Sequence, residues 1–200
     1  FTHAPIYYKA IENFKNDKLA CIKGDFDAII EIPHDILMEI QWWNKNVKHV
    51  CRHVIIPAPS YHLETDSSGT GWGGAGYDDQ KAYGHWSEIE QSYHINVQEL
   101  IGVYYMLLSI CKHKKDCHIR IHSDNTTVVA CLNKMASSKS MLFKYTRAIW
   151  LWAIQRSIHI SAQHIAGVDN SVADEQSRKV EKLDAEWMLS ESSVNVQWMF

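Results

Sequence analysis

The sequence predicts an α/β fold, a mixed five-stranded sheet flanked by helices and preceded by a small helical segment. Two observations predict it. Between residues 61 and 180, strand-like alternation and helical periodicity occur in the order β-β-β-α-β-α-α-β-α. Ahead of this region, residues 1–56 show mainly helical periodicity. Strands interleaved with helices in this order form a sheet with both parallel and antiparallel neighbours, covered by helices.

Residues 1–56 are expected to form a helical segment with two helices. The stretch YYKAIENFKN (7–16) is one candidate, and IPHDILMEIQWWNKNV (32–47), with Pro33 near its start, is the other. PAPS (57–60) then interrupts the pattern, because two prolines in four residues are unfavourable in either regular structure. We place the domain boundary there.

The second domain is predicted to begin with three strands. YHLETD (61–66) leads into a glycine-rich stretch, and GWGGAGYDD with KAYGHWS is expected to form a hairpin around residues 78–80. NVQELIGVYYMLLSICKH (96–113) has a wide apolar face and predicts a long helix. The remaining predicted elements are a strand (118–124), two helices (125–135 and 141–157), a strand (158–165) and a short helix (171–179).

Composition narrows the class of protein. The chain is 46% hydrophobic and 22% charged, which is ordinary for a globular protein. It has no run near the roughly 20 apolar residues that span a bilayer and no signal-peptide pattern, so we expect no membrane partner. Five scattered cysteines indicate a reducing intracellular setting, cytoplasm or nucleus. CKHKKDCHIRIH (111–122) mixes Cys and His, but its spacing matches no closed zinc site and its end alternates like a strand.

Charge is distributed unevenly, although the net charge is only −3. Residues 134–156 contain five basic residues and no acid, whereas residues 181–200 form an acidic C-terminal tail. The basic stretch is compatible with contact to a phosphate backbone and equally with a solvated helix face. The chain starts at Phe1, and we expect it to be a piece of a longer polypeptide.

Four acidic residues are the candidate catalytic groups. Asp66 ends the first strand, Glu99 lies in the first turn of the long helix, Asp124 follows a strand, and Asp174 is on the last helix. Sites of α/β sheets form at the carboxyl ends of strands, so these side chains could converge there. Carboxylates brought together repel one another unless cations bind, and oxygen ligands favour Mg²⁺ or Mn²⁺. Two such ions would support phosphodiester hydrolysis.

Each acid taken alone also has a structural explanation. Glu99 could close a capping box with Asn96, and Asp124 could cap the helix that follows it. Asp66 could open a turn, and Asp174 could be an exposed acid favoured by the helix dipole. These separate explanations do not account for the ordered set, or for His164, which lies in a loop ten residues before Asp174 and could carry a proton there.

The combined motifs resemble the ribonuclease H domain of retroelement reverse transcriptases. The likeness is carried by four motifs, TDSSGTGWGG, QEL, HSDN and HIAGVDNSVADEQSR. The sequence around these motifs is most similar to that of DIRS-like (tyrosine-recombinase) retrotransposons. The resemblance implies a ribonuclease H-like fold over residues 61–180, with residues 1–56 as the connection from the polymerase. It also implies metal ligands at Asp66, Glu99, Asp124 and Asp174, with His164 as a catalytic residue.

The resemblance implies an RNA–DNA hybrid as substrate and a reverse transcriptase polymerase domain in the same polyprotein. Candidate substrate-binding residues are Ser67, Gly69, Asn96, Asn125, Lys134 and Lys144, with His85 and Ser87 as further candidates. The glycine stretch lacks the lysine and hydroxyl residue that end a P-loop, and no GxGxxG opens a helix after it. Its small residues would let a nucleic-acid backbone approach the strand.

Three points stay open at this level. Glu88 and Glu90 compete with Glu99 for the catalytic role, although Glu99 occupies the "EL" position of the resemblance. A basic handle loop is not evident, since residues 136–144 are short and mildly basic. Two other functions also remain: an inactive scaffold of the same fold, or another nuclease or strand-transfer enzyme of that superfold.

Overall fold

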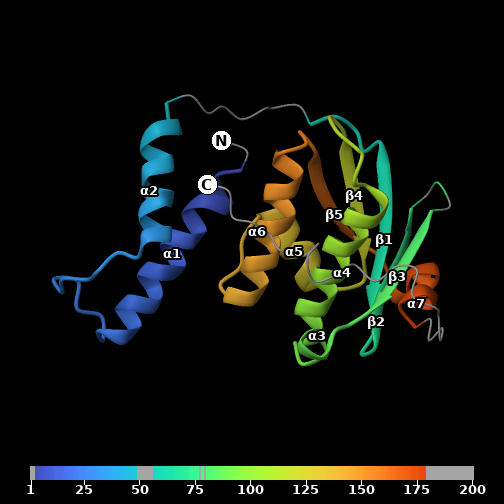
Figure 1. The fold of residues 1–200 in the computed structure, drawn as a ribbon, viewed down its shortest axis with the longest axis horizontal. Coiled ribbons are helices and arrows are strands. Elements are labelled where there is room, and N and C mark those ends of the chain that lie inside the picture. The colour runs from blue at the N-terminus through green and yellow to red at the C-terminus, as the bar shows by residue number, and fades with distance from the viewer. Residues whose placement is uncertain (1–2, 49–55, 77, 79, 179–200) are drawn as a thin grey trace.

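A computed structural model describes residues 3–48, 56–76, 78 and 80–178 of the 200-residue chain (Figure 1). The predicted acidic tail, residues 181–200, lies outside the described residues. The strands are β1 (Tyr61–Ser67), β2 (Gly71–Gly76), β3 (Lys81–His85), β4 (His118–Ser123) and β5 (His159–His164). The helices are α1 (Ala4–Cys21), α2 (His34–Asn46), α3 (Glu88–Gln91), α4 (Ile95–Ile110), α5 (Thr126–Lys134), α6 (Ser140–Ile154), the 3₁₀ turn η1 (Gly167–Asp169) and α7 (Ser171–Ser177).

The described strands form one five-stranded sheet in the order β3-β2-β1-β4-β5. The first three strands are joined as antiparallel neighbours, and the last two add in parallel, β4 beside β1 and β5 beside β4. The parallel connections contain helices, as such crossovers require. The predicted fold class, a mixed five-stranded sheet flanked by helices, is therefore confirmed.

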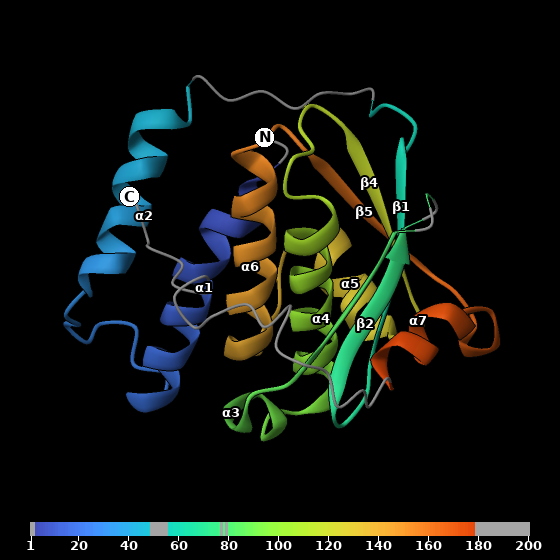
Figure 2. The ribbon, with the colours of Figure 1, turned by 45° about the vertical axis from the view of Figure 1, so that its right-hand side comes forward.

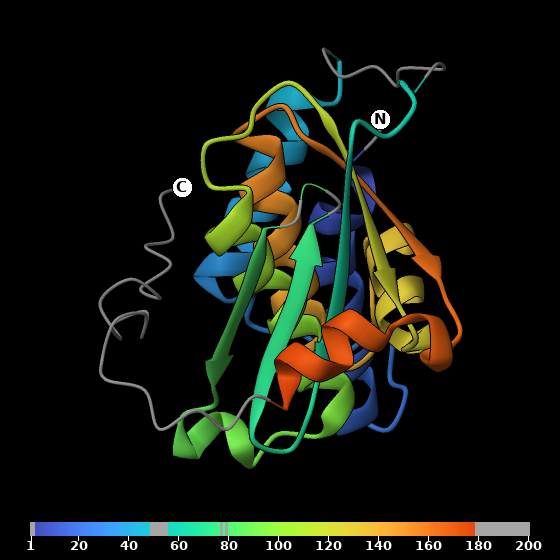
Figure 3. The same cartoon turned by 90° about the vertical axis from the view of Figure 1, so that its right-hand side faces the viewer.

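Helices cover both faces of the antiparallel half of the sheet. α4 packs on β1, β2 and β3 and against α6, and α7 contacts the same three strands. Figure 3 shows α7 crossing β2 in front of the sheet while α4 lies behind it. Two neighbouring glycines of β2 face these two helices from opposite sides of the sheet. A Cβ on Gly73 would meet Gln176 of α7, and a Cβ on Gly74 would meet Met106 of α4. Successive strand residues face opposite sides.

The glycines of β2 serve a packing role that the sequence did not predict. A Cβ on Gly73 would lie 2.5 Å from the backbone carbon of Gln176 and 2.5 Å from the nitrogen of Ser177. The backbone of α7 therefore lies directly against this strand. The expectation that nucleic acid would approach the glycine stretch is wrong at Gly73, because a helix of the same chain occupies that side.

The two N-terminal helices pack on each other, and α1 packs on α6 (Figure 2). Tyr7 of α1 stacks on Trp42 of α2 with ring centroids 3.8 Å apart, and Ile6 is fully buried. Glu39 of α2 forms an ion pair with Arg147 of α6. This contact uses one of the five basic residues of the 134–156 stretch for packing between segments. Among the described residues, no helix is both long and apolar enough to cross a membrane.

Candidate metal centre

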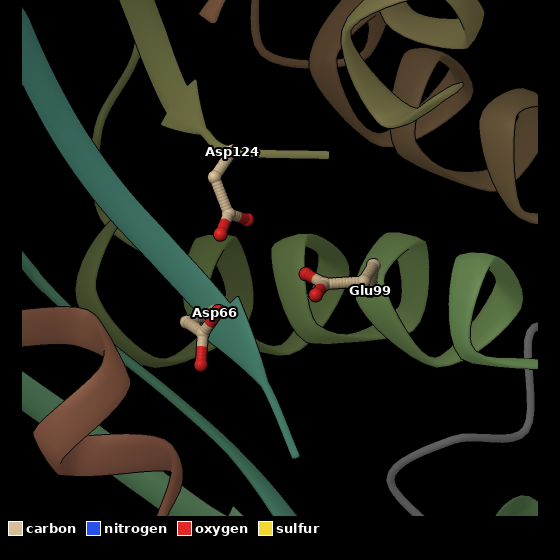
Figure 4. A group of neighbouring side chains, drawn as sticks. All are labelled: Asp66, Glu99 and Asp124. Atoms are coloured by element: carbon tan, nitrogen blue, oxygen red, sulfur yellow. The ribbon is translucent and has the colours of Figure 1, made fainter. Parts of the chain in front are cut away.

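Three of the four predicted acids meet at one edge of the sheet. Asp66 lies near the end of β1, Asp124 directly follows β4, and Glu99 is on α4. One carboxylate oxygen of each lies within 4.8 Å of the others, and Figure 4 shows the three side chains turned toward one another. Because all three are hard oxygen ligands, the cluster has the chemistry that Mg²⁺ and Mn²⁺ prefer.

Strand register explains how Asp66 and Asp124 come together. β1 and β4 are parallel neighbours, and their last paired residues are Glu64 and His122. Both aspartates stand two residues beyond that pair, so they occupy equivalent positions at the carboxyl edge of the sheet. Side chains two residues apart on a strand share a face, which directs both carboxylates to the same side.

A glycine brings Glu99 to the same place. A Cβ on Gly102 of α4 would lie 2.7 Å from the Ser67 hydroxyl oxygen, so the glycine lets α4 approach β1 closely without displacing this side chain. Glu99 lies three residues before Gly102, and residues three apart share a helix face. The close approach of α4 therefore places Glu99 against the end of β1.

Burial makes this cluster electrostatically unfavourable without a cation. Glu99 is 5% exposed, and burial, with added repulsion from Asp66 and Asp124, raises its pKa to about 9. Its Oε2 atom is buried and has no hydrogen-bond partner among the described residues. Burial also raises the pKa of Asp66, partly offset by a hydrogen bond from Ser177. A buried carboxylate oxygen without a partner beside two further carboxylates fits a divalent cation.

Asp174 lies outside the group of three. Its Oδ1 atom accepts a hydrogen bond and ion pair from Arg178 at 2.7 Å, and its side chain is 43% exposed. The charge of Asp174 contributes to the raised pKa of Asp66, which indicates that Asp174 lies near the cluster. Its assignment as a metal ligand stays a prediction.

His164 lies beside the cluster at the exposed end of β5. Its Nε2 atom is 3.1 Å from the backbone carbonyl oxygen of Asp124. The loop after it also approaches the site, since a Cβ on Gly167 would lie 3.2 Å from the Asp124 Oδ2 atom. The position of His164 is compatible with proton transfer at the site, and its catalytic role stays a prediction.

The structural explanations considered for Glu99 and Asp124 are wrong, whereas Asp174 does lie, partly exposed, in the first turn of α7. α4 begins at Ile95 with His94 as its N-cap, so Glu99 lies in the second turn and no capping box joins it to Asn96. Asn125, rather than Asp124, caps α5. The described capping box joins Ser87 and Glu90 in the short helix α3, which the sequence analysis did not predict.

That capping box also separates the competing glutamates from Glu99. Glu90 accepts hydrogen bonds from Ser87 and from the Tyr105 hydroxyl, so both of its carboxylate oxygens are in use. Glu88 is exposed on α3. Neither belongs to the group of converging carboxylates, whereas Glu99 does.

Sequence reasoning missed Ser177, which positions Asp66. Its hydroxyl donates to Asp66 Oδ2 at 2.7 Å, and α7 is further fixed by Asn170 Nδ2, which donates to the Thr65 carbonyl oxygen at 3.1 Å. The available signal was the spacing of Ser177, three residues after Asp174 on the same helix, which places both on one face.

The candidate substrate-binding residues occupy different environments. Asn125 Nδ2 donates to Asn96 Oδ1 at 2.9 Å, which links the start of α5 to the start of α4 beside the cluster. Ser67 is buried and contacts the Gln98 carbonyl oxygen at 3.3 Å, so it packs β1 on α4. Exposed positions are occupied by Gly69, Lys134 and Lys144.

No protein-family model and no curated protein matches the chain. Among solved structures, a ribonuclease H1 isolated from compost by a metagenomic approach is 17% identical, covers 60% of this chain and 93% of its own, and has a TM-score of 0.45. The N-terminal ribonuclease H domain of a Mycobacterium tuberculosis protein is 19% identical, covers 58% of this chain and 88% of its own, with a TM-score of 0.47.

Prototype foamy virus protease-reverse transcriptase is also similar. It is 10% identical, and the match covers 74% of this chain and 21% of that chain, with a TM-score of 0.36. The same compost ribonuclease H1 has been solved in complex with an RNA/DNA hybrid.

Proposed function

We propose that this chain is a divalent-metal-dependent endonuclease that cleaves the RNA strand of RNA–DNA hybrids during reverse transcription of a retroelement. The observation that carries the proposal is the convergence of Asp66, Glu99 and Asp124, with the buried Glu99 oxygen lacking a partner. These residues lie on the elements and in the order that the sequence resemblance implies. The DIRS-like phrasing of the motifs supports the retroelement context and a polymerase domain in the same polyprotein.

Each residue has a definite task in this proposal. Asp66, Glu99 and Asp124 would hold two Mg²⁺ or Mn²⁺ ions, and Asp174 would join them after exchanging its contact with Arg178. When bound, such ions activate water and neutralise charge on the scissile phosphodiester. His164, exposed beside Asp124, would take up or release a proton on the solvent side. Recognition of RNA would depend on its 2′-hydroxyl groups in the minor groove.

A cleavage panel tests the proposal. Purified chain is incubated with an RNA–DNA hybrid, double-stranded DNA or double-stranded RNA in Mg²⁺, in Mn²⁺ and in EDTA. We expect metal-dependent cleavage of the RNA strand of the hybrid alone, abolished by Asp124→Asn. Glu88→Gln, which removes an exposed carboxylate outside the cluster, is the matched control and should cleave normally. Hybrid cleavage that Asp124→Asn leaves unchanged would refute the assignment, and cleavage of double-stranded DNA would indicate another nuclease.

The ion pair between Asp174 and Arg178 favours one second candidate, an inactive scaffold of the same fold. A scaffold has no need of a metal site. Calorimetric titration with Mn²⁺ separates the two candidates, because the proposed enzyme should bind Mn²⁺ and lose that binding in Asp66→Asn. Glu64→Gln, two residues earlier on the same strand face, should retain it.

A further inference from the structure

A groove of about 560 Å³ lies between α1 and α5, outside the group of carboxylates. Lys9 of α1 lines one side of it, and residues of α5 and of the turn that follows line the other. None of its lining residues is acidic. Its polar lining consists of Lys9, Thr126, Thr127, Lys134, Ser137 and Ser138.

The walls of this groove are fixed by contacts within the protein. Asn13 of α1 donates from Nδ2 to the Ser137 carbonyl oxygen at 3.2 Å, which ties α1 to the turn after α5. That turn begins at Met135, whose positive φ of 55° ends α5. The Ser137 hydroxyl accepts a hydrogen bond from the Lys139 backbone N–H at 3.1 Å. The groove therefore exists before any ligand binds, which lowers the entropic cost of binding.

One end of the groove adjoins the metal centre. Thr127, in the groove wall, accepts a hydrogen bond from Asn96 Nδ2 at 3.3 Å, and Asn96 is bonded in turn to Asn125. Asn125 directly follows Asp124. Lys134, at the other end of α5, is eight residues from Thr126, a distance of about 12 Å along a helix.

We propose that this groove binds the phosphate backbone of the RNA–DNA hybrid next to the cleavage site, and that α1 is thereby part of the substrate-binding surface. The inference rests on the proposed function. Successive phosphates of a strand rise about 3.4 Å along the duplex axis and are further apart along the strand itself, so a span of about 12 Å is long enough to contact more than one of them. Lysine and hydroxyl donors are the side chains that contact phosphate oxygens. The groove would take the place of the basic handle loop that residues 136–144 do not provide.

The two lysines should contribute unequally. Lys134 is exposed and has no ion pair among the described residues. Lys9 is 16% exposed and forms an ion pair with Glu12 at 3.0 Å, which offsets part of its charge. Neutralising one phosphate contact lowers the salt slope by about 0.9, which corresponds to about eightfold weaker binding in 0.1 M salt. We expect that loss for Lys134→Gln and a smaller loss for Lys9→Gln, since the ion pair with Glu12 already offsets part of the Lys9 charge.

Hybrid binding is measured without cleavage, in EDTA, by fluorescence anisotropy of a labelled RNA–DNA hybrid over a series of salt concentrations. Lys115→Gln is the matched control, because this exposed lysine precedes β4 at the opposite edge of the sheet from Asp124. Glu12→Gln is a second probe of α1 and should tighten binding, because it releases Lys9. All four substitutions are at the surface or conservative, and circular dichroism confirms that each variant is folded.

The outcomes separate the groove from the proposed function. Weaker binding and a smaller salt slope in Lys134→Gln and Lys9→Gln, with Lys115→Gln unchanged, would support the groove. If the unmodified chain cleaves the hybrid while both groove variants bind like Lys115→Gln, the groove inference is overturned and the function stands. A chain that neither binds nor cleaves the hybrid overturns both.

Discussion

Replacing Glu99 by glutamine should stabilise the protein when no metal is present. Burial and the neighbouring charges of Asp66 and Asp124 raise the pKa of Glu99 from 4.5 to about 9. The folded state therefore holds this proton more tightly than the unfolded state. Stability must then fall as the pH rises from about 4.5 through about 9, because the native state binds more protons across that range.

The size of the effect follows from the two pKa values. At pH 7 the carboxyl group of Glu99 is ionised in the unfolded state but protonated in the folded state. Folding must therefore protonate a group whose unfolded pKa of 4.5 lies 2.5 units below the pH. At 1.36 kcal/mol per unit, this protonation costs about 3 kcal/mol. Glutamine has the same shape and no such cost, so Glu99→Gln should raise the melting temperature at pH 7 by roughly 6–12 °C. At pH 5 the gain should be under about 1 kcal/mol.

Thermal unfolding in EDTA at pH 5, 7 and 8.5 measures this difference. Glu88→Gln, an exposed carboxylate on α3, is the control and should match the unmodified chain at each pH. Added Mn²⁺ should then raise the melting temperature of the unmodified chain more than that of Glu99→Gln, because the variant has lost a ligand. A Glu99→Gln variant that is less stable than the unmodified chain at pH 7 in EDTA would refute the electrostatic argument.

Two further predictions concern packing, and urea denaturation measures both. Gly73→Ala should lower the free energy of unfolding by about 3 kcal/mol, since its Cβ would overlap the α7 backbone; Gly69→Ala, with nothing within 4 Å, should change it little. Arg147→Met should cost about 3–5 kcal/mol by leaving Glu39 buried without its partner. The double variant with Glu39→Gln should recover part of that loss, and equal stability of single and double variants would contradict a buried ion pair.

Periodicity in the sequence was enough to predict most of the sheet and its long helices. Strand segments such as residues 61–66 alternate because one face is buried, and α4 shows a wide apolar face because it packs on three strands. The convergence of Asp66 and Asp124 was also predictable, because it requires only that two parallel strands end at the same edge. Glu99 was identified mainly by its place in the QEL motif that carries the sequence resemblance.

The features that sequence reasoning did not predict depend on contacts between distant segments. The sequence of residues 71–76 does not indicate that α7 packs on their glycines, because this contact depends on where residues 171–177 lie in the folded chain. The pairing of Asp174 with Arg178 is a choice among side-chain conformations that periodicity does not encode. The groove between α1 and α5 likewise joins Lys9 to Lys134, two residues whose proximity only the packing of the N-terminal helix establishes.

The contacts of α7 have a consequence for how the protein is made. They join Thr65 to Asn170, Asp66 to Ser177 and Ser68 to Ser177, across sequence separations of 105 to 111 residues. At roughly 5–20 residues per second, a ribosome needs about 5–20 s to synthesise the intervening chain. During that interval the glycine strand β2 has no helix to cover its outer face and Asp66 lacks its hydroxyl partner. A nascent chain should therefore complete this carboxylate centre only after α7 has emerged, so the proposed metal site cannot form before residues 171–177 have been synthesised.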